Sequence, residues 1–130
     1  MCLDSLDPTI ADQFEDAGDG CVKGWKVFWR MAGGELGGEY RNTRAPRPRG
    51  QWLDADVFAD VDTNTASKLA GYKMGWHTLA TREAALTWAG GEGGNYTVVL
   101  QVLAKGPLAF GMQGDLPIGV FQHIFIPEEN

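Results

Sequence analysis

Cysteine is scarce in this chain of 130 residues, and long apolar runs are missing altogether. The two cysteines, Cys2 and Cys21, form no C-x-x-C pair and have no histidine at the spacing of metal ligands, so no zinc site is expected. A membrane helix needs about 18 consecutive apolar residues. Because no stretch approaches that length, the sequence predicts a protein that does not enter a membrane.

A secretory signal is also missing, since no basic region followed by an apolar core stands at the start of the sequence. We therefore expect a cytoplasmic protein with reduced thiols. The hydrophobic content of 44%, with 11% aromatic residues, is too high for a disordered chain. The length fits one globular domain and excludes a large multi-domain enzyme.

Basic residues are absent from the first twenty positions, which hold six acidic residues. The whole chain has 17 acidic and 11 basic residues, so residues 21–130 hold 11 of each and are neutral. We divide the chain into an acidic N-terminal arm, residues 1–20, and a single α+β domain, residues 21–130. An acidic arm could steer the protein toward a basic partner or could serve solubility alone.

The arm itself contains a predicted helix over residues 8–17. Asp7 is the expected N-cap, Pro8 the first helical residue and Gly18 the C-terminal stop. Apolar residues at i, i+4 and i+7 form one narrow stripe that docks either on the chain's own core or on a partner. For the second alternative, the candidate partner-binding residues are Ile10, Asp12, Phe14, Glu15 and Asp16.

Apolar patterns in the rest of the chain predict an α+β fold with a twisted, mostly antiparallel sheet of about five to six strands. The main helix is expected over residues 82–89, capped by Thr81 and ended by Gly90-Gly91. A nearly continuous apolar run at 96–103 is typical of a strand buried on both faces. The other candidate strands lie near 24–30, 39–42, 51–53, 75–79, 108–112 and 118–126.

Two charged stretches predict neither a metal site nor a nucleic-acid site. Residues 60–64 begin like a calcium loop, but Thr65 replaces the required glycine and Gly71 the bidentate glutamate. A basic cluster precedes an acidic one, and adjacent opposite blocks tend to neutralise each other, whereas nucleic-acid binding needs an uncompensated basic face. These clusters are Arg41, Arg44, Arg47 and Arg49, then Asp54, Asp56, Asp60 and Asp62.

The most patterned part of the chain is residues 75–89 followed by residues 96–102. A glycine-led strand contains a threonine near its end, a short helix with recurring alanines follows, and a hydrophobic strand comes next. This arrangement resembles the central unit of the ADP-ribosyltransferase-like fold. The resemblance implies that Arg30, at the end of an earlier strand, would hold NAD and that a late strand would supply a catalytic glutamate.

The late strand departs from this pattern, because Phe121 and His123 stand where the resemblance places a Glu-x-Glu motif. A transferase must stabilise an oxocarbenium-like sugar cation, which a carboxylate does and phenylalanine does not. We therefore predict no catalytic residue and a non-catalytic relative. If a nucleotide pocket is kept, its candidate residues are Arg30, Tyr72, Trp76, Thr78, Thr81 and His123, although packing, capping or a surface ion pair explains each of them as well.

These observations leave three functions. The first is a small non-catalytic protein-binding module that needs no cofactor and binds a host protein with a basic surface. In its small size and acidity the chain resembles phage-encoded and mobile-element-encoded inhibitors of host defence proteins, such as anti-CRISPR proteins. The alternative is an NAD-dependent ADP-ribosyltransferase-like enzyme, and a small regulatory or structural subunit is the third. For the first function, deletion of residues 1–20 should weaken partner capture with little loss of folding.

Overall fold

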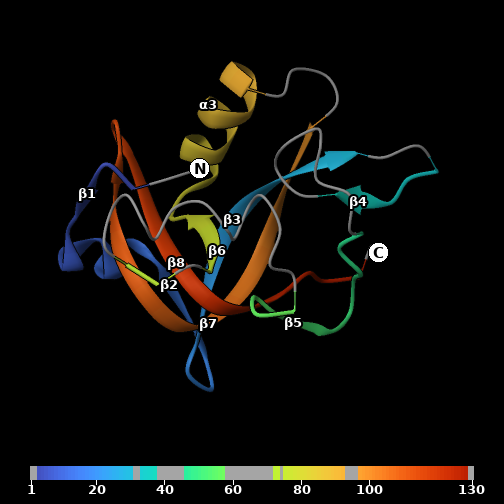
Figure 1. The fold of residues 1–130 in the computed structure, drawn as a ribbon, viewed down its shortest axis with the longest axis horizontal. Coiled ribbons are helices and arrows are strands. Elements are labelled where there is room, and N and C mark those ends of the chain that lie inside the picture. Colours follow the sequence, from blue (N-terminus) through green and yellow to red (C-terminus); the bar gives the residue numbers. More distant parts are fainter. Residues whose placement is uncertain are drawn as a thin grey trace.

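An antiparallel sheet dominates the computed structural model, which describes residues 3–30, 33–37, 46–57, 72–73, 75–92 and 97–128. Within these ranges the sheet has eight strands, accompanied by one α-helix and one 3-10 helix (Figure 1). The α+β class is confirmed, and the sheet has more strands than the five to six expected. The strands are β1 (Ser5–Leu6), β2 (Glu15–Gly18), β3 (Cys21–Arg30), β4 (Leu36–Gly37), β5 (Trp52–Asp54), β6 (Trp76–Leu79), β7 (Thr97–Gln113) and β8 (Leu116–Phe125).

Strand β7 organises the sheet because it pairs with two long strands in succession. Its residues 97–104 pair with β3, and its residues 103–113 pair with β8. The strand bends at Gly106, whose φ of 70° suits glycine, and the register shifts between Pro107 and Ala109. The two strands predicted at 96–103 and 108–112 are therefore one continuous bent strand.

The strand pairings form a closed circuit. Strand β6 pairs with β8 along its length and with β3 through Leu79 and Trp25, so β3, β7, β8 and β6 follow one another and return to β3. The shorter strands extend this circuit at its edges: β1 pairs with β7, β5 with β8, and β2 and β4 with β3. Successive side chains of a strand point to opposite faces of the sheet. The circuit of strands therefore separates two groups of buried side chains.

Each face of the sheet carries one of these hydrophobic clusters. The first contains Phe14, Phe28, Trp76 and Phe121, and the second is formed against the α-helix, whose buried residues include Trp88. Figure 1 shows this helix covering one side of the sheet. Consecutive residues of β3 belong to opposite clusters, as Val27 and Phe28 do. Because both faces of the sheet are covered, this strand is buried on both faces.

The main helix, α3 (Arg82–Glu92), begins where the sequence predicts. The Thr81 hydroxyl oxygen accepts a hydrogen bond from the backbone N–H of Ala84 at 3.1 Å, as an N-cap does. The predicted end at residue 89 is wrong, because the helix continues through Gly90 and Gly91. Glycine weakens a helix interior by about 1 kcal/mol relative to alanine but does not forbid it, so glycines alone fail to fix the end.

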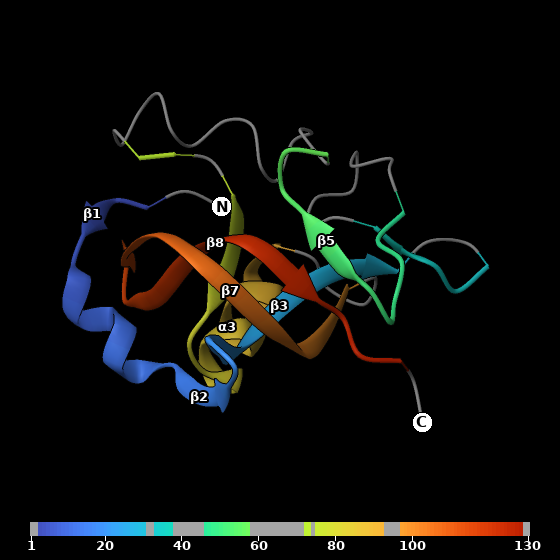
Figure 2. The ribbon, with the colours of Figure 1, turned by 90° about the horizontal axis from the view of Figure 1, so that it is seen from below.

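The predicted helix over residues 8–17 is only partly correct. A 3-10 helix, η1 (Pro8–Gln13), begins after Asp7, whose side chain accepts from the backbone N–H of Thr9 at 3.0 Å, so the predicted N-cap is confirmed. The chain then turns extended at Phe14 and continues as β2, which pairs with β3. Figure 2 shows the N-terminal segment, in blue, at one end of the domain, with β4 and the C-terminus toward the other.

Several predictions fall outside the described residues. These are the strand at 39–42, the calcium-like loop at 60–71, Cys2, Arg41, Arg44, Asp60 and Asp62. Among the residues that are described, no helix is both long and apolar enough to cross a membrane.

Candidate functional site

The six candidate nucleotide-binding residues do not surround one hollow. Trp76 and Thr78 are fully buried in β6, where the Trp76 indole N–H donates to the backbone oxygen of Leu53 at 3.0 Å. Thr81 caps α3, and His123 lies half-buried on β8. These four positions are accounted for by packing and capping, the explanation that the sequence left open beside the nucleotide one.

Tyr72 and Arg30 do line hollows, but different ones. The Tyr72 hydroxyl lies 2.7 Å from Nε2 of His77, a fully buried residue. The same hydroxyl accepts a hydrogen bond from the backbone N–H of Leu3 at 3.2 Å. Arg30 stands at the end of β3 beside β4. A single pocket built from both residues is therefore not present among the described residues.

The N-terminal segment, residues 3–19, is attached to the core by three buried side chains, Leu3, Ile10 and Phe14. Phe14 packs edge-on against Phe110 and Phe121, with ring centroids 5.8 Å and 5.5 Å apart. Ile10 and Phe14 were candidate partner-binding residues, and this part of the hypothesis is corrected. Their stripe docks on the chain's own core, so a partner cannot contact them unless the segment detaches.

The carboxylates of the same segment point outward. Asp4, Asp12, Glu15, Asp16 and Asp19 are exposed and Asp7 is half-buried. With its apolar residues buried, the segment is anchored and carries these exposed carboxylates, a set of residues that we call the acidic face. It keeps three of the candidate partner-binding residues, Asp12, Glu15 and Asp16.

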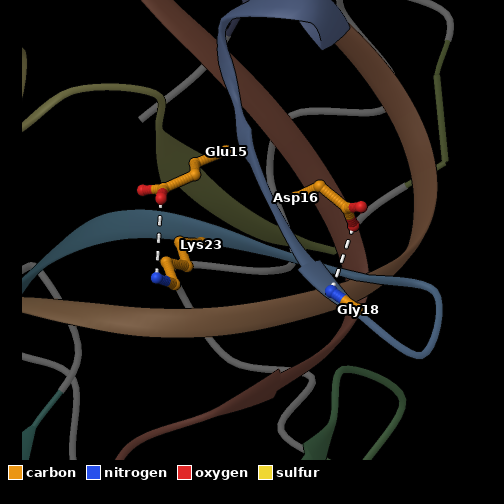
Figure 3. A network of polar contacts seen from close by, with 4 residues as sticks. All are labelled: Glu15, Asp16, Gly18 and Lys23. Carbon is orange, nitrogen blue, oxygen red and sulfur yellow. Dashed lines mark hydrogen bonds and ion pairs between the residues drawn. The ribbon is translucent and has the colours of Figure 1, made fainter.

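Few contacts offset this negative charge. Lys23 Nζ lies 3.5 Å from Glu15 Oε1, with both side chains well exposed, and Asp16 Oδ1 accepts from the backbone N–H of Gly18 at 3.1 Å (Figure 3). An exposed ion pair contributes at most about 1 kcal/mol, so Glu15 remains available to another cation. Among the described residues of the acidic face, this is the single ion pair with a lysine or arginine.

A hollow opens beside the acidic face. It has a volume of about 540 Å³, within the range of small-molecule and side-chain pockets. Its described walls come from the N-terminal segment, the bend of β7 and the residues before β6, and Lys73 is the one charged residue among the described lining residues. These are Leu6, Pro8, Tyr72, Lys73, Pro107, Leu108, Ala109 and Phe110.

Leu6 lines this hollow and is exposed, with 54% of its surface accessible. Asp7 stands between Leu6 and Pro8 in the chain, so an apolar hollow and carboxylates lie next to each other. Neither Leu6 nor the residues of the bend are among the candidate site residues predicted from the sequence. A Gly-Pro pair at positions 106 and 107 was the available signal, because such pairs mark a change of chain direction.

The described residues contain no cluster of three or more histidine, cysteine, aspartate or glutamate side chains that could hold a metal ion. Comparison with protein-family models, with curated proteins and with solved structures gives no match for this chain. The chain's own geometry is therefore the basis for assigning a function.

Proposed function

We propose that this chain is a small non-catalytic module that binds a protein partner through the acidic face and the hollow beside it. The observation that carries the proposal is the anchored N-terminal segment, whose apolar side chains are in the core while five carboxylates are exposed. An arm serving solubility alone needs no fixed conformation. A fixed array of like charges favours complementary binding and speeds association with an oppositely charged surface.

The partner that fits this surface has basic residues around an exposed apolar side chain. The apolar side chain would enter the hollow at Leu6, and the basic residues would bind carboxylates of the acidic face, Asp12, Glu15 and Asp16 among them. Binding surfaces commonly combine a buried apolar anchor with a charged rim. We propose a host defence protein as this partner, in keeping with the small size and acidity of the chain.

The positions of the candidate nucleotide-binding residues favour binding over transferase chemistry. The hollow that Arg30 lines has no carboxylate among its described lining residues, and Thr78 is fully buried elsewhere. A transferase needs a carboxylate beside its bound dinucleotide.

The test compares two triple variants of equal charge change. The first, Asp12→Asn with Glu15→Gln and Asp16→Asn, removes three charges from the acidic face and keeps the Asp7 cap. The matched control removes three charges elsewhere, at the exposed residues Glu35, Asp56 and Glu83. Wild-type protein and both variants are immobilised, and the proteins captured from host-cell lysate are identified by mass spectrometry at low and high salt.

The proposal predicts a partner that wild type and the control capture, that the first variant loses, and that high salt releases. Leu6→Ser should also weaken capture, because it removes the apolar rim of the hollow without adding charge. Equal capture by all of these variants would contradict the proposal, and so would the absence of any salt-sensitive partner.

A further inference from the structure

We propose a second site, a phosphate-binding hollow between Arg30 and Arg49, at the end of the domain away from the acidic face. The two arginines line the same hollow of about 230 Å³. Its other described lining residues are Gly34, Leu36, Val98 and Leu100, so the two arginines share this hollow with an apolar floor formed by these residues and with no described carboxylate. Glu128 lines a neighbouring hollow that also includes Arg49. This is a basic site in a chain whose net charge is −6.

The chain holds Arg49 in place from several directions. The backbone N–H of Arg47 donates to Leu36 O at 2.8 Å, and that of Gly50 donates to Ile126 O at 2.8 Å. Arg49 itself donates from Nη1 to Pro127 O at 3.2 Å. These bonds fix the segment on both sides of Arg49. Part of the entropy cost of ordering the Arg49 side chain is therefore met when the chain folds, and less of it remains when a ligand binds.

Arg47 strengthens this attachment. Its side chain is 2% exposed, and its guanidinium carbon lies 5.3 Å from the centre of the Trp76 ring, within the range of a cation–π contact. Arg47 and Arg49 also line a neighbouring hollow of about 310 Å³ together with Glu35. The buried arginine thus anchors the segment that presents Arg49, two positions further along.

Phosphate is the ligand class that fits best. A guanidinium group binds phosphate oxygens through two parallel N–H donors. Two guanidinium groups carry two positive charges, so a phosphate dianion matches them better than a carboxylate with one negative charge does. Bringing Arg30 and Arg49 to one hollow also costs repulsion, which a dianion between them would relieve. The apolar floor has no described aromatic ring on which a base could stack, so we assign the phosphate group itself rather than a nucleoside as the recognised part.

The test measures binding of inorganic phosphate, pyrophosphate, NAD and citrate by calorimetry and phosphorus NMR. Wild type should bind phosphate and pyrophosphate, and Arg30→Gln should weaken binding by about tenfold or more, since a charge-assisted hydrogen bond is lost. Arg30 is exposed, so this variant should fold. Arg82→Gln, at the exposed start of α3, removes the same charge elsewhere and should leave binding unchanged.

Two further measurements separate this site from general charge effects and from the proposed function. Phosphate binding should strengthen between about pH 5 and 7, because the second proton of the ligand leaves near pH 6 while arginine stays charged. The triple variant of the acidic face should bind pyrophosphate as wild type does. The inference is overturned if wild type binds neither phosphate nor pyrophosphate, or if Arg30→Gln binds them as tightly as wild type does. It is also overturned if the Arg30→Gln variant binds citrate or NAD with the affinity that pyrophosphate has for wild type.

Discussion

Substitution of Phe14 by alanine tests whether the N-terminal segment is part of the folded core. The side chain is 7% exposed and contacts two other rings at centroid distances of 5.8 Å and 5.5 Å. The sequence has glycine where the ring approaches most closely, since a Cβ at Gly119 would lie 2.9 Å and one at Gly24 3.2 Å from ring atoms of Phe14. The ring therefore fills a space that no neighbouring side chain can take over.

The expected loss in the free energy of unfolding is about 3–5 kcal/mol, the usual cost of a buried Phe→Ala substitution. The upper part of this range is expected because two edge-to-face contacts disappear and adjacent glycines cannot refill the space. Urea denaturation followed by tryptophan fluorescence measures the change. Leu86→Ala is the control, because Leu86 is 43% exposed and its truncation should change stability far less.

Deletion of residues 1–20 extends the same prediction and reverses the expectation from sequence. The deletion removes Leu3, Ile10 and Phe14 from the core, at about 2–5 kcal/mol each, against a total stability of about 5–15 kcal/mol for a typical domain. The truncated chain should therefore be largely unfolded by circular dichroism. A cooperative unfolding transition in the truncated protein, or a loss below about 1 kcal/mol for Phe14→Ala, would refute the argument that this segment belongs to the core.

Two smaller effects arise from hydrogen bonds. Thr81→Ala should cost about 1 kcal/mol in urea denaturation, because the N–H of Ala84 loses its cap; an unchanged midpoint would contradict this. The pKa of Asp54 lies below its usual value, chiefly because the backbone N–H of Asp56 donates to it, with help from the Gln122 side chain. Its contribution to stability is then present at neutral pH and lost as the pH falls through the lowered pKa. Gln122→Ala should raise the pKa of Asp54 in an NMR titration, and an unchanged value would rule out that contribution.

The long strands could be predicted from sequence because their apolar runs are long enough to override local detail. Strand β3 and most of β7 and β8 lie where the runs predict them. The bend of β7 could not be predicted, since Gly106-Pro107 equally marks a turn between two strands. Which of the two forms depends on β8 being present to pair with both sides of the bend.

The N-terminal helix shows the opposite situation: the local sequence correctly predicts where the helix begins but not where it ends. Asp7 and Pro8 start a helical segment as predicted. Beyond Gln13, however, the pairing of Glu15 with Lys23 across β2 and β3 replaces further helical turns. A short helix with acidic residues near its C-terminal end is marginal, so tertiary pairing decides the conformation of that end.

The burial of a charged side chain could not be predicted from the sequence pattern either. Lys26 occupies a polar position in the alternation of β3, yet it is fully buried, with Nζ donating to His77 O at 2.9 Å and lying 5.8 Å from the centre of the Trp76 ring. A lysine can bury its long stem if its ammonium group finds partners. The approach of β6 to β3 supplies these two partners, and the hydrogen bond joins residues more than fifty positions apart.

The arginine cluster shows why charge neutrality cannot be judged from neighbouring positions in the sequence. Asp54 follows Arg49 by five residues, yet its Oδ1 accepts from the backbone N–H of Asp56 at 2.9 Å and from Gln122 Nε2 at 2.6 Å. Arg49 meanwhile donates to the backbone oxygen of Pro127. The first aspartate after the cluster is thus bound to groups other than these arginines. A hydrogen bond to a neutral carbonyl does not offset the charge of a guanidinium, so this contact leaves Arg49 able to bind phosphate at the hollow that it shares with Arg30.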